Sequence, residues 1–412
     1  MQKTIIIIDP MVSSGYLIQR FNEFGYGVIA FLTMDIPERL KGFSYTQFPF
    51  AKIIEASGDL SKDIREIKSP EQYTIVAGFT GVDSAINYGE RVLKTLFPAF
   101  SNNPATSSYR SNKFMMNDVI KKHNLPYIQH ETIDYHLDDR QKIEQTVAFY
   151  RRYKQIVIRP VTGSGASVNV FSPKNETDIA NYFKKFEPYF FKSDFLLQEK
   201  VFGPEYYINC ASYKGRHYIT TIGQYVKTEV NGTFEYERLD AVEKDSAEYL
   251  AIRTYILDCL NALGMLNGLS HTEIIMTNKG PRLIELNPRI SGMYGCVNMM
   301  AKRRYDVDQI SAYINLLENK KIPNSNRQVY QRIFIFKNKK GNYHNIDLSA
   351  IKQLGSYISH RIINPKCLMD DKSEESLLSI VMCILLEHPD KKVIEQDCDI
   401  LSDLEKRGSC LI

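Results

Sequence analysis

Residues Ser270–Gly292 read S-H-T-E-I-I-M-T-N-K-G-P-R-L-I-E-L-N-P-R-I-S-G, and the rest of the chain is organised around them. Two apolar-rich runs flank Asn278–Gly280, a short turn whose glycine can take a positive φ, so the stretch predicts a β-hairpin. With the lysine of this turn at the centre of a three-residue loop, Glu273 and Glu285 are each six residues from the centre. The count predicts that these two carboxylates lie directly opposite each other.

Further polar side chains gather on the same predicted hairpin. The same count places His271 opposite Asn287, and period-2 alternation puts Glu285, Asn287 and Arg289 on one face if the strand continues that far. Two like charges directly opposite each other destabilise a sheet, so this arrangement favours a cation between the carboxylates. The carboxylate and amide oxygens are hard ligands, which suits Mg²⁺ bridged to nucleotide phosphates. A solvated hairpin with scattered acids is the alternative.

The composition is that of an ordinary globular protein. A chain of 412 residues with 43% hydrophobic and 24% charged residues has room for two or three domains. The net charge of +4 is small for this length and argues against a nucleic-acid partner. The chain has no apolar run of about 18 residues, so no membrane span is expected.

The N-terminus and the cysteines suggest a compartment. The apolar run of Ile5–Ile8 is too short for a signal peptide and predicts a first buried strand. The seven cysteines are odd in number and widely spaced, without a C-x-x-C pair, so neither a zinc site nor a disulfide framework is indicated. A reduced, cytoplasmic enzyme is the expected class.

Strand-like runs alternate with helical patterns in the first hundred residues, as in an open α/β sheet. The predicted strands are residues 4–8, 28–32 and 74–79, and a helix is expected over about 82–96. Ligands of such sheets bind beyond the carboxyl ends of strands, where Thr80, Asp83 and Ser84 stand. Helix capping by Asp83 or Ser84 is the alternative. No G-x-G-x-x-G follows the first strand, so a dinucleotide site is not supported.

A glycine-containing loop follows a short strand in the middle of the chain. Residues 156–160 predict a strand that ends near Arg159, and a second strand returns over 168–171. The loop between them, Thr162–Ser167, has small residues whose backbone N–H groups can approach phosphates. A surface turn explains the same loop. Before it, residues 112–124 predict a helix with Lys113, which alone counts for little.

The remaining elements predict two further parts of the chain. Strands are expected over 195–200, 206–213 and 217–226, and helices over 247–263 and 306–317. An acidic run with Glu235, Glu237 and Asp240 is interpreted as a solvated loop. Beyond Pro323, short strands over 332–336, 356–363 and 379–386 predict a small, mostly β domain. The predicted domains are 1–104, 105–323 and 324–412.

Together these elements resemble the ATP-grasp superfamily over essentially the whole chain. The resemblance rests on four motifs in order: Asn103-Pro104 with Lys113, Val157–Pro160 with Thr162–Ser167, Gln198–Glu205, and Glu273, Glu285 and Asn287 with Arg289. It implies an α/β (α+β) fold, with an N-terminal open α/β domain, a two-lobed ATP-grasp domain and a small β-rich C-terminal domain. The chain departs from many members at Arg159, where they have Lys, and at Asn112, where they have Asp.

The resemblance also implies roles for individual residues. Arg289 would be the catalytic cation, and Glu273, Glu285 and Asn287 would bind Mg²⁺, with Mn²⁺ as an alternative. ATP would be held by Lys113, Arg159, Gly163, Ser164, Gly165, Glu199, Lys200, Val201 and Glu205.

Within the superfamily, H-T-E-I at 271–274 ahead of G-P-x-L-I-E-x-N-P-R is similar to the L-amino acid ligases, which include the bacilysin- and rhizocticin-pathway enzymes. These join two amino acids with ATP through an acylphosphate, and carnosine synthases share the domain. The implied partners are small-molecule amino acids, with no nucleic acid or membrane; a homodimer is one assembly the chain could form. The implied substrate residues are Asp83, Ser84, Glu237, Asp240, His271 and Met293, with Asp240 in place of a histidine in an E-x-x-H element.

The acidic set suggests a substrate. If Glu235, Glu237, Asp240 and Asp83 line the pocket, the N-terminal amino acid should be basic, such as arginine. If they are solvated, the pocket should prefer an apolar residue. Two other functions remain open, namely a biotin-carboxylase-like or formate-using enzyme, and a nucleotide-binding regulatory protein with a dead site.

Overall fold

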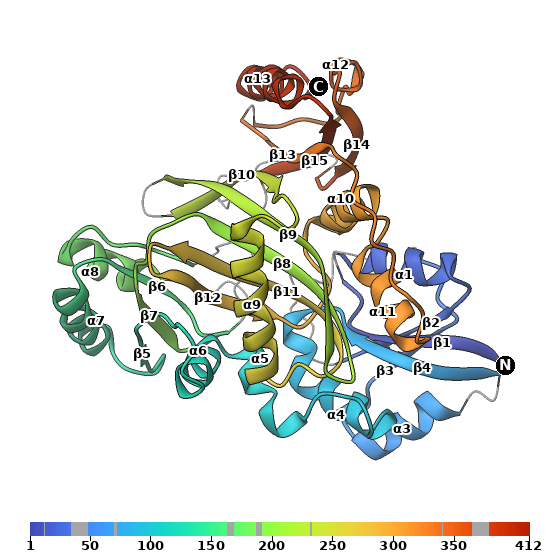
Figure 1. The fold of residues 1–412 in the computed structure, drawn as a ribbon. Helices are drawn as coiled ribbons and strands as arrows, with labels where there is room; N and C mark the ends of the chain where they lie inside the picture. The colour runs from blue at the N-terminus through green and yellow to red at the C-terminus, as the bar shows by residue number, and fades with distance from the viewer. Residues whose placement is uncertain are drawn as a thin grey trace.

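The structure is a computed structural model with three β-sheets and the helices that cover them (Figure 1). It describes residues 1–11, 13–33, 48–69, 72–162, 169–186, 192–230, 233–339, 341–364 and 379–412. In this described part, no helix is long and apolar enough to cross a membrane.

The N-terminal domain is an open parallel sheet with strand order β3-β2-β1-β4, as the alternating pattern predicts. Its strands are β1 (Gln2–Ile8), β2 (Gly27–Leu32), β3 (Lys52–Glu55) and β4 (Tyr73–Thr80). Its helices are α1 (Ser14–Glu23), α3 (Leu60–Lys68) and α4 (Ile86–Leu96), and the short 3₁₀ helix η1 (Asp83–Ala85) joins β4 to α4.

The isoleucine side chains of β1 pack into two hydrophobic cores, one on each face of the sheet. Because side chains alternate across a strand, Ile5 and Ile7 belong to the core that includes α1, whereas Ile6 and Ile8 face the core with α3 and α4. All four side chains are fully buried. A strand buried on both faces reads as a continuous apolar run, which explains why the sequence shows no alternation here.

A linker and a small lobe follow. The linker contains η2 (Pro104–Thr106), α5 (Ser108–Ser111) and α6 (Lys113–Lys122). The small lobe has an antiparallel sheet of order β5-β7-β6, with β5 (His130–Ile133), β6 (Ile156–Pro160) and β7 (Phe195–Glu199), covered by α7 (Asp139–Tyr153) and α8 (Glu176–Lys185). Phe171 forms a single bridge with Ile158 where a returning strand is predicted, and residues 163–168 lie outside the described part.

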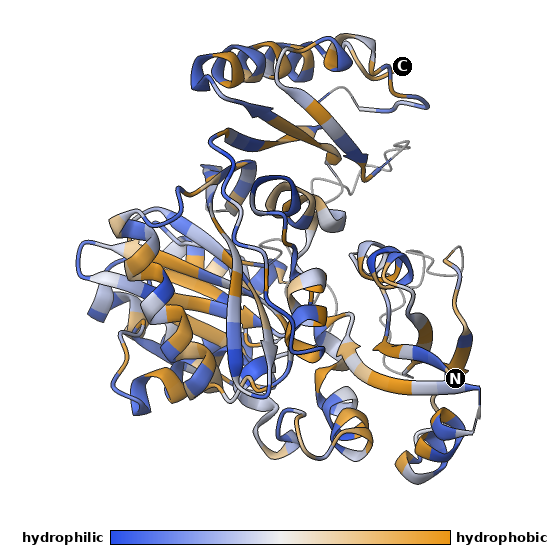
Figure 2. Cartoon of the chain, turned by 45° about the vertical axis from the view of Figure 1, so that its right-hand side comes forward, coloured by the Kyte–Doolittle hydropathy of each residue, from blue (hydrophilic) through white to orange (hydrophobic). Residues whose placement is uncertain are grey.

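An antiparallel sheet of eight strands forms the centre of the molecule, in the order β12-β11-β8-β9-β10-β13-β15-β14. Its first five strands are β8 (Glu205–Tyr213), β9 (Arg216–Val230), β10 (Thr233–Ala241), β11 (Gly268–Thr277) and β12 (Gly280–Asn287). Helix α9 (Ala247–Ala262) packs across this sheet, where apolar side chains of both form one core (Figure 2). The chain then passes through η3 (Met293–Gly295), α10 (Cys296–Tyr305) and α11 (Gln309–Leu317).

The acidic run predicted as a loop is in fact strand β10. Its sequence, T-F-E-Y-E-R-L-D-A, alternates apolar and polar residues in two stretches whose phase changes at a bulge between Tyr236 and Arg238. Because of this shift, Tyr236 and Leu239 pack against the same core, which includes residues of β13 and β15. Charge density concealed this period-2 signal, because acidic runs are usually solvated.

The segment after Pro323 has a hydrophobic core of its own, and its strands continue the large sheet. Its strands β13 (Tyr330–Lys337), β15 (Ile380–His388) and β14 (Tyr357–Ile362) extend the large sheet beyond β10. It also contains α12 (Ser349–Lys352) and the 17-residue helix α13 (Lys391–Arg407), which the sequence analysis did not predict. The sheet therefore crosses the predicted boundary at residue 324.

A buried ion pair connects the N-terminal domain, the linker and the end of α9. Arg110 donates to Glu90 from Nε at 2.8 Å and from Nη2 at 2.6 Å, and to the carbonyl oxygen of Leu263 at 2.7 Å. Both charged side chains are almost fully buried.

Replacing Arg110 with methionine should lower the free energy of unfolding by about 3–5 kcal/mol, because the Glu90 carboxylate would stay buried without its cation. Urea unfolding followed by circular dichroism measures this loss. The control is Arg140→Met, which removes an exposed pair with Glu144 and should leave the free energy of unfolding nearly unchanged. Equal effects of the two substitutions would contradict the structural role of Arg110.

Candidate active site

The predicted hairpin is β11 and β12, and its two glutamates lie opposite each other as predicted. Glu273 pairs with Glu285, and His271 with Asn287. The turn contains only two residues, since Thr277 pairs with Gly280, and a bulge between the turn and Glu285 restores the predicted register. Strand β12 ends at Asn287, so the Arg289 that the sequence analysis put on the same strand face lies in the turn after it.

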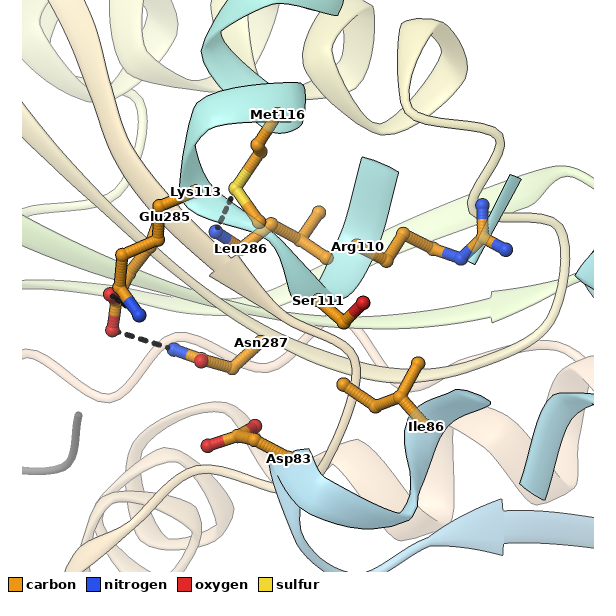
Figure 3. A pocket seen from close by; sticks show the side chains of 9 residues that line it. All are labelled: Asp83, Ile86, Arg110, Ser111, Lys113, Met116, Glu285, Leu286 and Asn287. Carbon is orange, nitrogen blue, oxygen red and sulfur yellow. Dashed lines mark hydrogen bonds and ion pairs between the residues drawn. The ribbon is translucent and has the colours of Figure 1, made fainter. Parts of the chain in front are cut away.

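Glu285 is the meeting point of three parts of the chain. Its carboxylate lies 2.6 Å from Nη2 of Arg159 on β6 and 3.3 Å from Nζ of Lys113 at the start of α6. It also accepts a hydrogen bond of 3.1 Å from the amide nitrogen of Asn287 (Figure 3). Burial opposes ionisation, but the charges of Lys113 and Arg159 hold the pKa of Glu285 well below its usual value.

Lys113 is held in place by the local structure of its helix. Asn112 caps α6, its side chain accepting a hydrogen bond of 3.0 Å from the backbone nitrogen of Met115. Asparagine and aspartate are about equally good at this position, which accounts for the Asn where many relatives have Asp. The backbone nitrogen of Lys113 also donates to Val161 at 3.0 Å, which connects the helix to the chain after β6.

The second carboxylate of the hairpin has a histidine partner. Nε2 of His271 lies 3.4 Å from Glu273 and 3.0 Å from the hydroxyl of Tyr225, while Nδ1 lies 2.8 Å from the side-chain oxygen of Asn209. Burial raises the pKa of Glu273, but the hydrogen bond with His271 and the charge of Lys227 bring it below its usual value. The carboxylate is therefore ionised at neutral pH, as a metal ligand must be.

Lys227 on β9 is a site residue that the sequence analysis missed. Its Nζ forms an ion pair of 2.5 Å with Glu205 and lies 4.3 Å from the ring centroid of Tyr236. Burial raises the pKa of Glu205, and the charge of Lys227 opposes this rise. Lys227 was missed because β9 was predicted to end at Val226, whereas it continues to Val230. The continuing alternation of V-K-T-E-V was the available signal.

Arg289 is held by the N-terminal domain. Its Nε and Nη2 donate to the two carboxylate oxygens of Asp83 at 2.8 and 3.0 Å. Burial lowers the pKa of Arg289, but the charge of Asp83 and the hydrogen bonds with it raise the pKa above its usual value.

The predicted nucleotide hinge connects the small lobe to the large sheet. The backbone nitrogen of Glu199, at the end of β7, donates to the carbonyl oxygen of Gln129, just before β5, at 2.9 Å. The carboxylate of Glu199 accepts a second hydrogen bond from the backbone nitrogen of Gln129 at 3.1 Å. Lys200 pairs with Glu229 at 2.8 Å, and Val201 is half-buried beside it. At Gly203, φ is 150° and a Cβ atom would lie 1.8 Å from the carbonyl oxygen of Met276, so only glycine fits.

Several predicted substrate residues have other partners. Asp240 forms a two-pronged ion pair with Arg332 at 2.5 and 3.1 Å, and Glu237 accepts a hydrogen bond from Thr228. Glu235 pairs with Lys337 at 2.8 Å.

Ser84 and Met293 do not take part in these pairs. Ser84 in η1 has a buried hydroxyl without a hydrogen-bond partner among the described residues. Met293 has a φ of 60° and packs against the core that contains Tyr207 and Tyr225. Gly163, Ser164 and Gly165 lie outside the described residues.

A small hollow opens beside these charges. Figure 3 shows it between η1, the linker helices and the end of β12. It is lined by Asp83, Ile86, Arg110, Ser111, Lys113, Met116, Glu285, Leu286 and Asn287.

Four cations and four carboxylates, most of them buried, gather in this region. They are Lys113, Arg159, Lys227, Arg289, Asp83, Glu205, Glu273 and Glu285. A cluster that is neutral overall suits a ligand whose own charges nearly cancel, such as a polyphosphate with its divalent metal ions.

Comparison with known proteins agrees with this geometry. Residues 110–293 match a family described as an ATP-grasp domain, and this range contains Lys113, Arg159, the hairpin and Arg289. Dapdiamide A synthase of Enterobacter agglomerans is 26% identical over 302 residues, which are 71% of this chain and 68% of that protein. Residues 110–293 of the chain therefore form an ATP-grasp domain.

Solved structures extend the similarity over nearly the whole chain. The L-amino acid ligase from Bacillus licheniformis superposes with a TM-score of 0.76 at 16% identity, covering 98% of this chain and 97% of that one. The ADP complex of N5-carboxyaminoimidazole ribonucleotide synthetase superposes with a TM-score of 0.70 at 15% identity, covering 97% and 96%. At these identities the match establishes the fold, and the N-terminal and C-terminal segments belong to it.

Proposed function

We propose that this ATP-grasp ligase joins two L-amino acids into a dipeptide, with release of ADP and phosphate. The observation that carries the proposal is the buried Glu273–Glu285 pair, with Lys113 and Arg159 on one carboxylate and Arg289 in the turn that follows. The similarity to dapdiamide A synthase and to the fold of an L-amino acid ligase supports it.

The chemistry requires activation of a carboxylate. At neutral pH a carboxylate does not react with an amine, because oxide is a very poor leaving group. Transfer of the γ-phosphoryl group of ATP to the first amino acid makes an acylphosphate, which the amino group of the second then attacks. The amino group attacks in its neutral form, phosphate leaves as the amide bond forms, and the amine gives up a proton. Arg289 stabilises the negative charge that develops on the carbonyl oxygen of the acyl group during this attack.

A divalent metal ion fits the hairpin. Glu273 and Glu285 are ionised and buried, and Asn287 uses its amide nitrogen toward Glu285, which leaves its oxygen as a third ligand. Oxygen ligands of this kind suit Mg²⁺, and Mn²⁺ as an alternative. When bound, the ion would neutralise phosphate charge during transfer.

The nucleotide would lie between the small lobe and the large sheet. Lys113 and Arg159 would leave Glu285 for the phosphates when the metal takes over that carboxylate. The hinge residues Glu199, Lys200 and Val201 would hold adenine, and Glu205 the ribose. Gly163, Ser164 and Gly165 remain the proposed phosphate loop.

The two amino acids would bind on the N-terminal side of the hairpin. We assign His271, Ser84 and Met293 to this region, with the unpartnered hydroxyl of Ser84 as a hydrogen-bonding group for a substrate. Asp83, Glu237 and Asp240 were predicted to prefer a basic N-terminal amino acid, but each already has a protein partner. Their geometry therefore gives arginine no advantage.

We expect leucine to be used in the N-terminal position at least as well as arginine. The measurement is a competition of the two amino acids for alanine as acceptor, with product masses and fragment order identified by mass spectrometry. A charge-assisted hydrogen bond to a free carboxylate is worth about 1.5–3 kcal/mol, or one to two decades in kcat/KM. An arginine preference of that size would support the prediction that acidic side chains line the substrate pocket.

The decisive test of the function is phosphate release screened over pairs of the twenty amino acids, with mass spectrometry of the products. Amide formation that depends on ATP and on a divalent metal ion is the expected result. The competing function is that of a carboxylating ATP-grasp enzyme, whose fold the chain also shares. Phosphate release that depends on bicarbonate and not on amino acids would favour it and exclude dipeptide synthesis.

A further inference from the structure

Side chains of the N-terminal domain form hydrogen bonds with the turn that contains Arg289. Thr80, the last residue of β4, donates a hydrogen bond of 2.8 Å to the carbonyl oxygen of Pro288. Three residues later, Asp83 accepts from Nε and Nη2 of Arg289 at 2.8 and 3.0 Å. Side chains from one end of the parallel sheet thus fix both the backbone and the side chain of this turn.

The large sheet does not provide this fixation. Strand β12 ends at Asn287, and the backbone nitrogen of Arg289 reaches back only to the Asn287 carbonyl oxygen, at 2.9 Å. An arginine side chain has many rotamers and loses conformational entropy when it is ordered. A two-pronged contact with a carboxylate selects one orientation of the guanidinium group.

We propose that Asp83 is the positioning residue for Arg289 and keeps its guanidinium group away from the metal-binding carboxylates. The proposal rests on the proposed function, in which Arg289 acts on the acyl group. It replaces the predicted role of Asp83 as a ligand for a basic substrate, because both of its carboxylate oxygens are already used by Arg289.

The need for such a residue follows from the surrounding charges. Glu273 and Glu285 are opposed carboxylates on the hairpin whose second strand ends two residues before Arg289, so they attract a cation at this position. Without Asp83, a buried cation would turn toward these carboxylates and compete with the metal ion for them. Asp83 supplies a carboxylate for this cation from the N-terminal domain.

The contact also leaves donors for the reaction. Arg289 has five N–H donors, and in the described structure Nε and Nη2 each give one to Asp83, while Nη1 gives one to the Ile290 carbonyl oxygen at 3.1 Å. Two donors remain for the developing negative charge. Asp83 therefore orients the guanidinium group and still leaves two of its N–H donors for the substrate.

The first test is the kinetics of Asp83→Asn. Asparagine keeps the size of the side chain but removes its charge and one of the two acceptors. We expect kcat for amide formation to fall about 10- to 100-fold, while KM for ATP changes little. The matched control is Glu176→Gln, because Glu176 contacts Arg151 at the same two distances, 2.8 and 3.0 Å, on the surface of the small lobe. This control should keep kcat.

The second test measures metal affinity and needs no turnover. Mn²⁺ is titrated into each protein with ADP present, and free Mn²⁺ is read by electron paramagnetic resonance. Asp83→Asn should weaken Mn²⁺ binding about 10-fold or more, because Arg289 then occupies the carboxylates. Removing that arginine as well, in Asp83→Asn with Arg289→Ala, should restore the affinity.

These outcomes separate the two proposals. Unchanged Mn²⁺ affinity in Asp83→Asn, or no recovery in the double variant, would overturn the positioning role. A wild-type protein that forms no amide from any pair of amino acids would overturn the proposed function instead, while the Mn²⁺ titration would still decide the role of Asp83.

Discussion

Glu285→Gln is expected to lower turnover more than about 100-fold at saturating Mg²⁺, since even the outer partners of metal ligands typically account for 10- to 100-fold. The substitution removes one of the two opposed carboxylates of the hairpin. It also releases Lys113 and Arg159 from their shared anion. Binding of ATP without divalent metal should therefore not weaken, because both cations remain for the phosphates.

Phosphate release measures the turnover, and calorimetric titration of ATP in the presence of a chelator measures binding. The control is Glu387→Gln, because Glu387 is also buried and also contacts two cations, Arg303 at 2.9 Å and Arg327 at 3.0 Å. Both variants should be less stable to heat, but only Glu285→Gln should lose turnover. Near-normal phosphate release at saturating Mg²⁺ would show that Glu285 is not a ligand of the metal ion.

Arg289→Ala should lower kcat about 10²- to 10³-fold with little change in ATP affinity. Loss of one donor to a developing oxyanion typically has this effect, because the interaction is stronger in the transition state than in the ground state. The five-donor guanidinium group lies in the turn directly after Glu285 and Asn287, the proposed metal ligands, and in the proposed function it contacts the reacting acyl group rather than the adenine.

The measurement is steady-state kinetics with ATP varied at saturating amino acids. Arg332→Ala is the control, because Arg332 also forms a two-pronged ion pair with an aspartate, Asp240, on the extension of the large sheet. It tests whether loss of such a pair alone lowers kcat. A loss of ATP affinity with kcat unchanged would assign Arg289 to nucleotide binding.

Most of the fold follows from local patterns. The isoleucine run of β1, the alternation around the hairpin and the small-residue turns predicted β1, β2 and β4 of the parallel sheet, the hairpin, and β6 and β7 of the small lobe. The strands β3, β5 and β10 and the helices α3, α7, α8 and α13 were not predicted. The acidic residues of β10 suggested a solvated segment and concealed its alternation of apolar and polar residues. Whether such an alternation marks a buried strand depends on which other strands cover its apolar face.

The pairing of Glu273 with Glu285 was predicted by counting from the turn, although the turn and the bulge each differ from the prediction by one residue. The two differences cancel, because burial of one face of the hairpin selects the register at the glutamates more strongly than the turn does. The roles of Lys113 and Arg159 came from the resemblance. No local pattern connects Arg159 to a carboxylate 126 residues later.

Local patterns were therefore enough to predict the hairpin and its opposed carboxylates, and the order of the motifs indicated an ATP-grasp domain. Which cation neutralises which acid became clear only from the folded chain. Asp83 contacts Arg289, 206 residues later, and Asp240 contacts Arg332, 92 residues later, so both carboxylates already have a protein partner. Periodicity records which face of a strand is buried, whereas the partner of a buried charge depends on which distant strands pair and how separate domains pack together.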